Sequence, residues 1–414
     1  MSESETVEVT GHLMDSGILS RILDDIREYG GDYVIDKFEV GHDTHDLSRA
    51  VITVTAEDDE ALQRLLMRLQ TRGVNQVDPG EAHTSPAEQD GVFPDGFYST
   101  TNLATKVRIG GRWLDVANPE MDCGLVVESD ESGTPTRVIT LPMSDVRVGM
   151  QVVCGASGIR VQIPVTSKSD EAFGFMESDV SSEKPQAVLV RQVADGMREA
   201  KANGKKVLWV GGPGVVHTGA APAMVAMVNA GFVDVLFAGN ALATHDIESS
   251  LYGTSLGIDL AMGHGVEHGH EHHIRALNTI RKEGSIKAAV DNGVLTGGIM
   301  HALVSQGKEF VLVGSVRDDG PLPDVYTDVI EGQRAMRAQL QDVGFCLMVA
   351  TMLHSVATGN ILPASIPLVC VDINPATVTK LADRGSSQAR GIVTDVGLFL
   401  EQLAVELVPE YRRA

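Results

Sequence analysis

The segment from Ile366 to Asp372 constrains the fold of this chain most strongly. It is an apolar run that ends on a carboxylate, and Asn374, Pro375 and Gly385 then suit the cap, first turn and stop of a helix. A continuous apolar run predicts a strand buried on both faces of a parallel sheet. An acid at the carboxyl end of such a strand is where nucleotide-binding sheets bind a ribose diol. We therefore expect Asp372 to bind a dinucleotide. NAD is favoured over NADP, because a 2′-phosphate ~4 Å away would be repelled by about 4 kcal/mol at an effective dielectric of 20.

Composition excludes several classes of partner. The chain has 414 residues and a formal net charge of −23, which argues against nucleic acid or an anionic membrane surface. No stretch of roughly 18 apolar residues lacks His, Asp and Asn, so we expect no membrane span. The acidic N-terminus predicts no signal peptide. The four cysteines lack metal-ligand spacing, which favours buried free thiols in a cytoplasmic protein.

Hydrophobic patterning divides the chain into three predicted domains. Residues 1–78 follow the β-α-β-β-α-β order of a ferredoxin-like α+β unit. A linker over 79–97 leads to a small β-rich domain at 98–166, and an acidic, Ser-rich joint covers 167–185. Residues 186–414 alternate strands with helices, which predicts a doubly wound, Rossmann-like parallel sheet. The expected fold class is therefore α/β.

In the last domain, six strands and three of the separating helices are predicted by residue range. The strands are 207–210, 233–238, 310–313, 346–349, 368–371 and 392–394, and the helices are 221–230, 285–305 and 328–341.

Polar residues follow these strands at the edge where ligands bind open α/β sheets. Each has a plainer alternative: a helix cap for Asn240 and Asp395, solvated loop acids for Asp318 and Asp319, and a core histidine for His354. Their shared position at strand ends favours convergence on one ligand. The pairs and runs are Asn240 with Ala241, Asp318 with Asp319, Thr351 to His354, and Asp395 with Val396.

Two further stretches leave alternatives open. The glycine-rich turn 211–219 suits phosphate binding at a helix N-terminus, but its spacing is not GxGxxG, and a packing turn is as good an interpretation. The cluster 264–273 holds five histidines. Its glycines break helical ligand geometry, so we expect a ligand-facing loop rather than a metal site. Cys123 is expected to be a structural thiol rather than a nucleophile.

Several strings resemble known families. Residues 11–17, with Gly30-Gly31 and Val40-Gly41, resemble the conserved region between the two parts of plant lysine-ketoglutarate reductase/saccharopine dehydrogenase. Later strings resemble the archaeal-type ornithine cyclodeaminases and the C-terminal module of cyanobacterial arginine dihydrolase–ornithine cyclodeaminase fusions. These later strings are 98–102, 212–219, 237–243, 267–273 and 317–324.

The resemblance implies an ammonia-lyase that converts L-ornithine to L-proline by internal hydride transfer through bound NAD, on a nucleotide domain similar to that of deoxyhypusine synthase. We also expect a homo-oligomer without a resident metal, and Asp318 or Asp319 as the proton-transfer group. The alternatives are an NAD-dependent amino-acid dehydrogenase and a non-catalytic amino-acid or nucleotide sensor. The implied cofactor contacts are Asn240, Ala241, Asp319, Thr351, Met352, Leu353, His354, Asp372, Asp395 and Val396.

Overall fold

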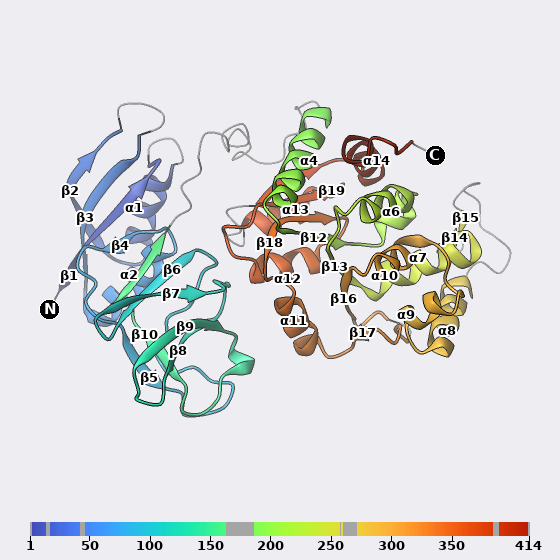
Figure 1. Cartoon of the computed structure of the whole chain (residues 1–414). Helices are drawn as coiled ribbons and strands as arrows, with labels where there is room; N and C mark the ends of the chain where they lie inside the picture. The colour runs from blue at the N-terminus through green and yellow to red at the C-terminus, as the bar shows by residue number, and fades with distance from the viewer. Residues whose placement is uncertain are drawn as a thin grey trace. The chain divides into compact units, whose positions relative to one another are not determined.

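The structure is a computed structural model, and its chain divides into two compact units. The first comprises Met1–Gly174 with Asn360–Ser365, and the second comprises Phe175–Gly359 with Ile366–Ala414 (Figure 1). The residues that the structure describes are 2–13, 17–41, 46–162, 186–256, 258–259, 271–318, 320–383 and 389–412.

The first unit begins with a ferredoxin-like sheet. In its described part, four strands lie in the order β2-β3-β1-β4 with antiparallel pairing, and two helices interrupt them along the chain. Alternate residues of β3 are buried, as one covered face requires. The predicted order is confirmed. The elements are β1 (Glu3–Gly11), α1 (Ile18–Glu28), β2 (Asp32–Glu39), β3 (Ser48–Ala56), α2 (Asp59–Gln70) and β4 (Asn75–Gln76).

A second sheet of the first unit is rich in antiparallel pairs. Its order is β11-β6-β7-β9-β8-β10-β5 over the described residues. The prediction that 79–97 is only a linker is wrong, because β5 within it pairs with β10. This edge position tolerates Pro86. The elements are β5 (His83–Pro86), β6 (Ala104–Ile109), β7 (Arg112–Ala117), β8 (Gly124–Ser129), β9 (Pro135–Leu141), η1 (Met143–Asp145), β10 (Gln151–Cys154) and β11 (Ile159–Gln162).

The predicted boundaries at 78, 98 and 166 stay a prediction. The joint 167–185 lies outside the described residues.

The second unit contains a parallel sheet in the order β17-β16-β13-β12-β18-β19-β20. Counted from β12, the strands run third-second-first-fourth-fifth-sixth, with β17 added at one edge. This is the doubly wound order that the strand-helix alternation predicted. The strands are β12 (Lys206–Gly211), β13 (Val235–Gly239), β16 (Glu309–Val313), β17 (Val325–Tyr326), β18 (Val343–Val349), β19 (Leu368–Asp372) and β20 (Ala389–Val393).

Every residue of β19 is buried, as its apolar run predicted. Asn374 accepts a hydrogen bond from the Ala376 amide at 3.0 Å, and α13 begins at Pro375. The predicted stop at Gly385 lies outside the described residues.

Helices lie on both faces of this sheet (Figure 1). The predicted single helix 285–305 is instead two helices, because Gly293 takes a left-handed conformation (φ 69°) that ends the first. The helices and a small hairpin are α4 (Gln186–Ala202), α5 (Gly214–His217), α6 (Ala221–Asn229), α7 (Asn240–Tyr252), β14 (Thr254–Ser255), β15 (Ile258–Asp259), α8 (His272–Glu283), α9 (Ile286–Asp291), α10 (Gly298–Ser305), α11 (Val329–Ala338), α12 (Leu353–Ile361), α13 (Pro375–Asp383) and α14 (Val396–Leu407). Among the described residues, no helix is long and apolar enough to cross a membrane.

Candidate active site at the carboxyl edge of the parallel sheet

The chain leaves β12 toward β13 and leaves β18 toward β19, so the order reverses between the neighbouring strands β12 and β18. In open α/β sheets, ligands bind outside the carboxyl ends of the strands at such a switch point. The predicted site residues follow β13, β16, β18, β19 and β20. They therefore belong to one edge of one sheet.

The β18–α12–β19 segment has the layout of a dinucleotide-binding βαβ unit. After β18, Ala350 adopts a left-handed conformation (φ 54°), and α12 starts at Leu353. The first amides of a helix have no intrahelical acceptor and favour phosphate oxygens. Asp372 ends β19 about 20 residues later, the spacing at which an acid reaches a ribose diol. Asp372 is only 8% exposed, and its Oδ1 accepts a hydrogen bond from the Asn374 amide at 2.8 Å.

The predicted run from Thr351 to His354 enters α12. Thr351 and Met352 are half-buried, while the Leu353 side chain is 77% exposed. A Cβ added to Gly239 would lie 3.1 Å from His354 Cε1, so the imidazole lies over the end of β13. Burial lowers the pKa of His354, although the Val313 backbone and the Asp318 carboxylate act in the opposite direction.

The influence of Asp318 on His354 means that the ends of β16 and β18 share one electrostatic environment. Asp318 is half-buried, and its Oδ2 accepts a hydrogen bond from the Ser315 amide at 2.7 Å. The structure thus brings together two residues predicted from separate strands. Asp319, predicted for both catalysis and cofactor binding, lies outside the described residues.

Asn240 is buried at the start of α7, but it is not a helix cap. Gly239 occupies the cap position without a side-chain bond. The Asn240 Oδ1 accepts hydrogen bonds from the Leu322 amide at 3.0 Å and from the Thr244 hydroxyl at 3.3 Å. Asn240 therefore ties the loop after β16 to the end of β13. Ala241 follows it in the first turn, half-buried.

Asp395 does cap a helix, as its alternative interpretation proposed. Its Oδ1 accepts a hydrogen bond from the Leu398 amide at 2.7 Å, while the residue stays exposed before α14. Val396 packs into the core. The Val396 side chain therefore contacts the core, whereas its backbone lies just after the end of β20. A cofactor contact by either residue stays a prediction.

The glycine-rich turn after β12 is explained by packing at two of its positions. A Cβ on Gly212 would lie 1.8 Å from the Ala350 carbonyl oxygen, and one on Gly214 would lie 2.9 Å from the Ala350 Cβ. Both glycines let the turns after β12 and β18 approach each other closely. The packing interpretation of this turn is therefore confirmed for Gly212 and Gly214.

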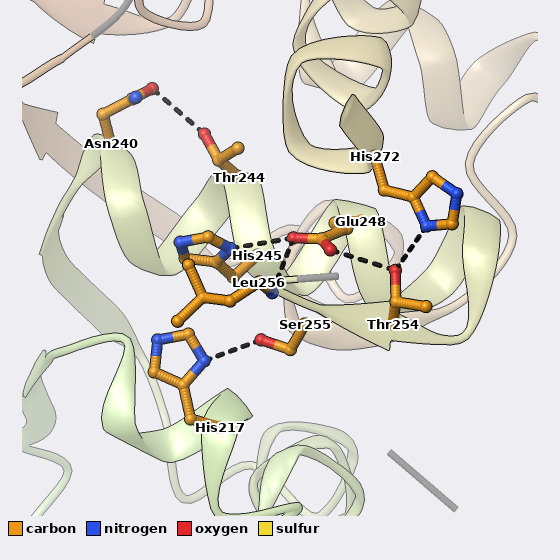
Figure 2. A network of polar contacts seen from close by, with 9 residues as sticks. All are labelled: His217, Asn240, Thr244, His245, Glu248, Thr254, Ser255, Leu256 and His272. Carbon is orange, nitrogen blue, oxygen red and sulfur yellow. Dashed lines mark hydrogen bonds and ion pairs between the residues drawn. The ribbon is translucent and has the colours of Figure 1, made fainter. Parts of the chain in front are cut away.

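A buried polar network beside the end of β13 was not predicted (Figure 2). The Glu248 side chain is fully buried and accepts a hydrogen bond from the Thr254 hydroxyl at 2.9 Å and from the Leu256 amide at 3.2 Å. His245 Nδ1 lies 2.9 Å from Glu248 Oε2. Thr254 Oγ1 also lies 2.8 Å from His272 Nδ1. The network joins α7, β14 and α8.

A second histidine faces His245 from the turn after β12. His217 Nδ1 lies 2.6 Å from Ser255 Oγ, and the ring centroids of His217 and His245 are 4.9 Å apart. Burial lowers the pKa of His217, and the neighbouring His245 lowers it further, while Glu248 opposes both. His217 therefore favours the neutral imidazole near neutral pH.

Asp246, which follows His245 in α7, has a structural role. Its two carboxylate oxygens accept hydrogen bonds from the Ile299 and Met300 amides at 2.7 and 2.8 Å, at the start of α10. Burial raises the pKa of Asp246 to about 6.

The cysteines and the histidine cluster are also candidate functional groups in the sequence. All four cysteines are buried thiols that form no disulfide, as predicted, including Cys123. Across the described ranges, no three His, Cys, Asp or Glu side chains are arranged to hold a metal ion. Most of the histidine cluster 264–273 lies outside the described residues; His272 and His273 begin α8.

Three consecutive regions of the chain match known family models. Residues 4–103 match the LOR/SDH bifunctional enzyme conserved region. Residues 104–190 match the first C-terminal region of arginine dihydrolase ArgZ-like proteins, and 191–403 match their C-terminal Rossmann fold. The ornithine cyclodeaminase of Methanothermobacter thermautotrophicus is 49% identical over 402 residues, or 97% of each chain. The chain belongs to the archaeal ornithine cyclodeaminase family.

Solved structures extend the relationship to the cyanobacterial members. The apo structure of ArgZ, an arginine dihydrolase from Cyanobacteria, matches with a TM-score of 0.85 at 35% identity. AgrE, solved as a ternary complex with ornithine and NAD+, matches with a TM-score of 0.52 at 40% identity. The chain is 98% covered in both comparisons but spans only 58% of either protein. The resemblance inferred from the sequence is confirmed.

For this cyclodeaminase family member, the sequence contained one overlooked sign of the buried network. Residues 244–248 read Thr-His-Asp-Ile-Glu in the helix that directly follows a buried strand. His and Glu three residues apart share a helix face. Polar residues near the start of a helix that packs into the core indicate a functional site. Their partners in β14 and α8 follow loops, whose course hydrophobic periodicity does not predict.

Proposed function

We propose that this chain converts L-ornithine to L-proline and ammonia with NAD as a recycled hydride carrier. The chain is an enzyme of a family whose curated members are ornithine cyclodeaminases, 42–49% identical to it in the archaeal members. AgrE, a more distant member, binds ornithine and NAD+. The observation that carries the proposal is the β18–α12–β19 unit, in which a helix start is followed by the buried acid Asp372.

The residues at this edge fit NAD in chemistry. Asp372 would hold the ribose diol, and the start of α12, with Thr351 and Met352, would hold the pyrophosphate. Asp395 and Val396, beyond the neighbouring strand, would lie on the same side as the ribose. Asn240 and Ala241, across the switch point, would meet the other end of the dinucleotide.

The proposed reaction is redox-neutral overall. Bound NAD supplies a reversible hydride acceptor for the substrate Cα. The α-amine becomes an imine, the δ-amine attacks that carbon, and the α-nitrogen leaves as ammonia. The resulting cyclic imine takes the hydride back at the same carbon, which gives proline. The chain must accept a proton from one nitrogen and donate one to the other. Asp318, Asp319 or both are our proposed groups, and Asp318 lies in the electrostatic environment of His354. Ring closure is intramolecular, so positioning contributes strongly.

Incubation of the purified protein with ornithine and substoichiometric NAD tests this function. Proline and ammonia should form in equal amounts, many per NAD, with no net NADH absorbance. NADH accumulating without proline would instead establish an amino-acid dehydrogenase. Tight binding of both ligands with no turnover would establish a sensor. Lysine and 2,4-diaminobutyrate in parallel reactions measure the accepted chain length.

We also propose that the protein is a cytoplasmic homo-oligomer. Strand β2 is a sheet edge with exposed apolar side chains, among them Val34, which is 62% exposed, and such edges favour protein contacts. Four buried cysteines that form no disulfide suit a reducing compartment. Light scattering behind size-exclusion chromatography should give a mass above one chain, and a single-chain mass would contradict the proposal.

A further inference from the structure

The buried histidine network lies in the half of the sheet that the proposed ribose and pyrophosphate contacts leave open. Those contacts use β18 and β19, whereas His217 follows β12 and His245 lies in α7, directly after β13. α7 begins at Asn240, and Asn240, Thr244 and Glu248 recur every four residues along one helix face. The hydrogen bond between Thr244 and Asn240 continues this polar line toward the strand end. A nicotinamide ring bound across the switch point would lie near Asn240, Thr244 and Glu248.

Hydrogen bonding fixes how His245 presents its ring. An ionised carboxylate only accepts hydrogen bonds, and Glu248 already receives them from Thr254 and Leu256. His245 Nδ1 therefore carries a proton toward Glu248, and its Nε2 holds the lone pair when the ring is neutral. Because Thr254 donates its only hydroxyl hydrogen to Glu248, His272 Nδ1 must donate to Thr254.

The two facing imidazoles point their other nitrogens in one direction. Figure 2 shows that the second ring nitrogen of His217 and that of His245 both lie on the side away from Ser255 and Glu248. Two neutral imidazoles at 4.9 Å between centroids can share one incoming proton, since protonation of one disfavours protonation of the other. This arrangement suits an amine, which arrives as an ammonium and must lose a proton.

We propose that His245 and His217 exchange protons with the amino groups of the diamino-acid substrate, and that Glu248 and Ser255 are their positioning residues. The inference rests on the proposed function and adds to Asp318 a second proton-exchanging group. One imidazole accepts the proton that the α-ammonium loses before Cα is oxidised, and returns a proton to the same nitrogen when it leaves as ammonia. The proton count is then unchanged over the cycle.

A purely structural role explains less of the network. The links between α7 and β14 are made by Glu248 with Thr254 and Leu256, and they need neither histidine. The nearby helix start of α10 is held by Asp246. Within the described residues, the imidazole rings of His217 and His245 bond to the side chains of Ser255 and Glu248, which orient them.

Matched glutamine variants test the inference. His245→Gln and His217→Gln remove the proton-exchanging nitrogen, and His301→Gln, on α10 outside the network, is the control. The readouts are kcat and KM for ornithine, NAD affinity by calorimetry, and thermal unfolding. General acid–base groups contribute about 10²–10⁴-fold in rate. We expect kcat to fall about 100-fold or more in His245→Gln, with NAD affinity and unfolding temperature as in the His301→Gln control.

The pH profile separates proton exchange from packing. Among the described residues, Glu248 on α7 bonds to His245, and the His273 ring on α8 lies 6.4 Å from that of His245; His272, also on α8, is linked to Glu248 through Thr254. In the wild type, kcat/KM should fall at acidic pH as His217 takes up a proton, because its neutral ring is needed. Burial lowers the pKa of His217, so this limb should lie below the ordinary histidine range. Glu248→Gln should shift the pH at which kcat/KM falls. Ser255→Ala should shift it too, by changing the hydrogen bond of His217 alone.

The outcomes are distinct from those of the proposed function. Wild-type protein that makes no proline removes the function itself. Wild-type turnover with normal kcat and an unchanged pH limb in His245→Gln and His217→Gln overturns this inference. If His245→Gln does not fold, Ser255→Ala is the deciding variant. An unchanged acidic limb of its pH profile of kcat/KM rejects the inference, and a shifted limb with a normal unfolding temperature supports it.

Discussion

The parallel sheet has two halves of the same layout, and they use polar residues at their carboxyl ends differently. In the second half (β18, β19, β20), the acids bond to the backbone just ahead of them: Asp372 to Asn374 and Asp395 to Leu398. In the first half (β12, β13, β16), the bonds that join separate loops run between residues far apart in sequence, although Asp318 also bonds locally to Ser315. The two residues of the Asn240–Leu322 bond are 82 positions apart.

This difference teaches what each half is built to do. Short-range bonds shape one turn and leave the strand end open, which suits a nucleotide that lies along it. Long-range bonds lock separate loops into one arrangement, as His217 with Ser255 and Asp246 with Ile299 do. Reacting groups need such locking because they must be held in one geometry. The comparison predicts that the first half is the more costly to disturb.

Asp246→Ala should have the largest effect on stability. It strands the Ile299 and Met300 amides, and a buried unsatisfied donor costs roughly 1–3 kcal/mol. We expect the free energy of unfolding to fall by about 3 kcal/mol in urea titrations. A loss no larger than that of Asp395→Ala would break the comparison, because the long-range cap would then contribute no more than the local one.

The titration of Asp246 predicts that the free energy of unfolding also depends on pH, by an amount similar to the loss expected in Asp246→Ala. Burial raises the pKa of Asp246 to about 6, above its ordinary value of 3.8, so the folded state binds this proton more tightly than the unfolded state. Its contribution is fully present below pH 3.8 and is lost as pH rises through about 6, which amounts to roughly 3 kcal/mol.

Asp246→Asn cannot lose this proton. The difference in unfolding free energy between wild type and Asp246→Asn should therefore change across that window, in favour of the variant as pH rises. A constant difference would show that the carboxyl group does not titrate there.

In the second half, Asp372→Ala should act on the cofactor more than on the fold. Hydrogen bonds to a charged group contribute roughly 1.5–3 kcal/mol, or about a 10- to 150-fold loss of NAD affinity. Calorimetry with NAD and NADP measures this. The variant should also discriminate less against NADP, since the repulsive carboxylate is gone. Unchanged affinity for both would remove Asp372 from the ribose site.

The contrast between the halves also explains what could be predicted from sequence. The apolar run ending at Asp372, the cap at Asn374 and the doubly wound order follow from local patterning, and the structure has them. Partners across long loops could not be predicted, because periodicity places a residue on an element but not elements against each other. His245 and Glu248 were missed for this reason.

Two errors have local causes. The break in the helix predicted at 285–305 was overlooked, although Gly293 precedes two further glycines, Gly297 and Gly298. The linker prediction is wrong at strand β5 because prolines in and around it are typical of loops, whereas an edge strand accommodates them.

The smallest effect predicted is at Asp395, where capping and cofactor binding can be separated. Asp395→Ala removes the bond to the Leu398 amide and should cost about 1 kcal/mol of unfolding free energy, as helix caps do. Asp395→Asn keeps a capping oxygen and should be nearly as stable as wild type, because Asn and Asp cap equally well. If Asp395 serves only α14, both variants bind NAD normally. If its charge also contacts the cofactor, Asp395→Asn loses affinity while keeping stability. That result would show that a local bond leaves the carboxylate available for the ligand, as the comparison of the two halves requires.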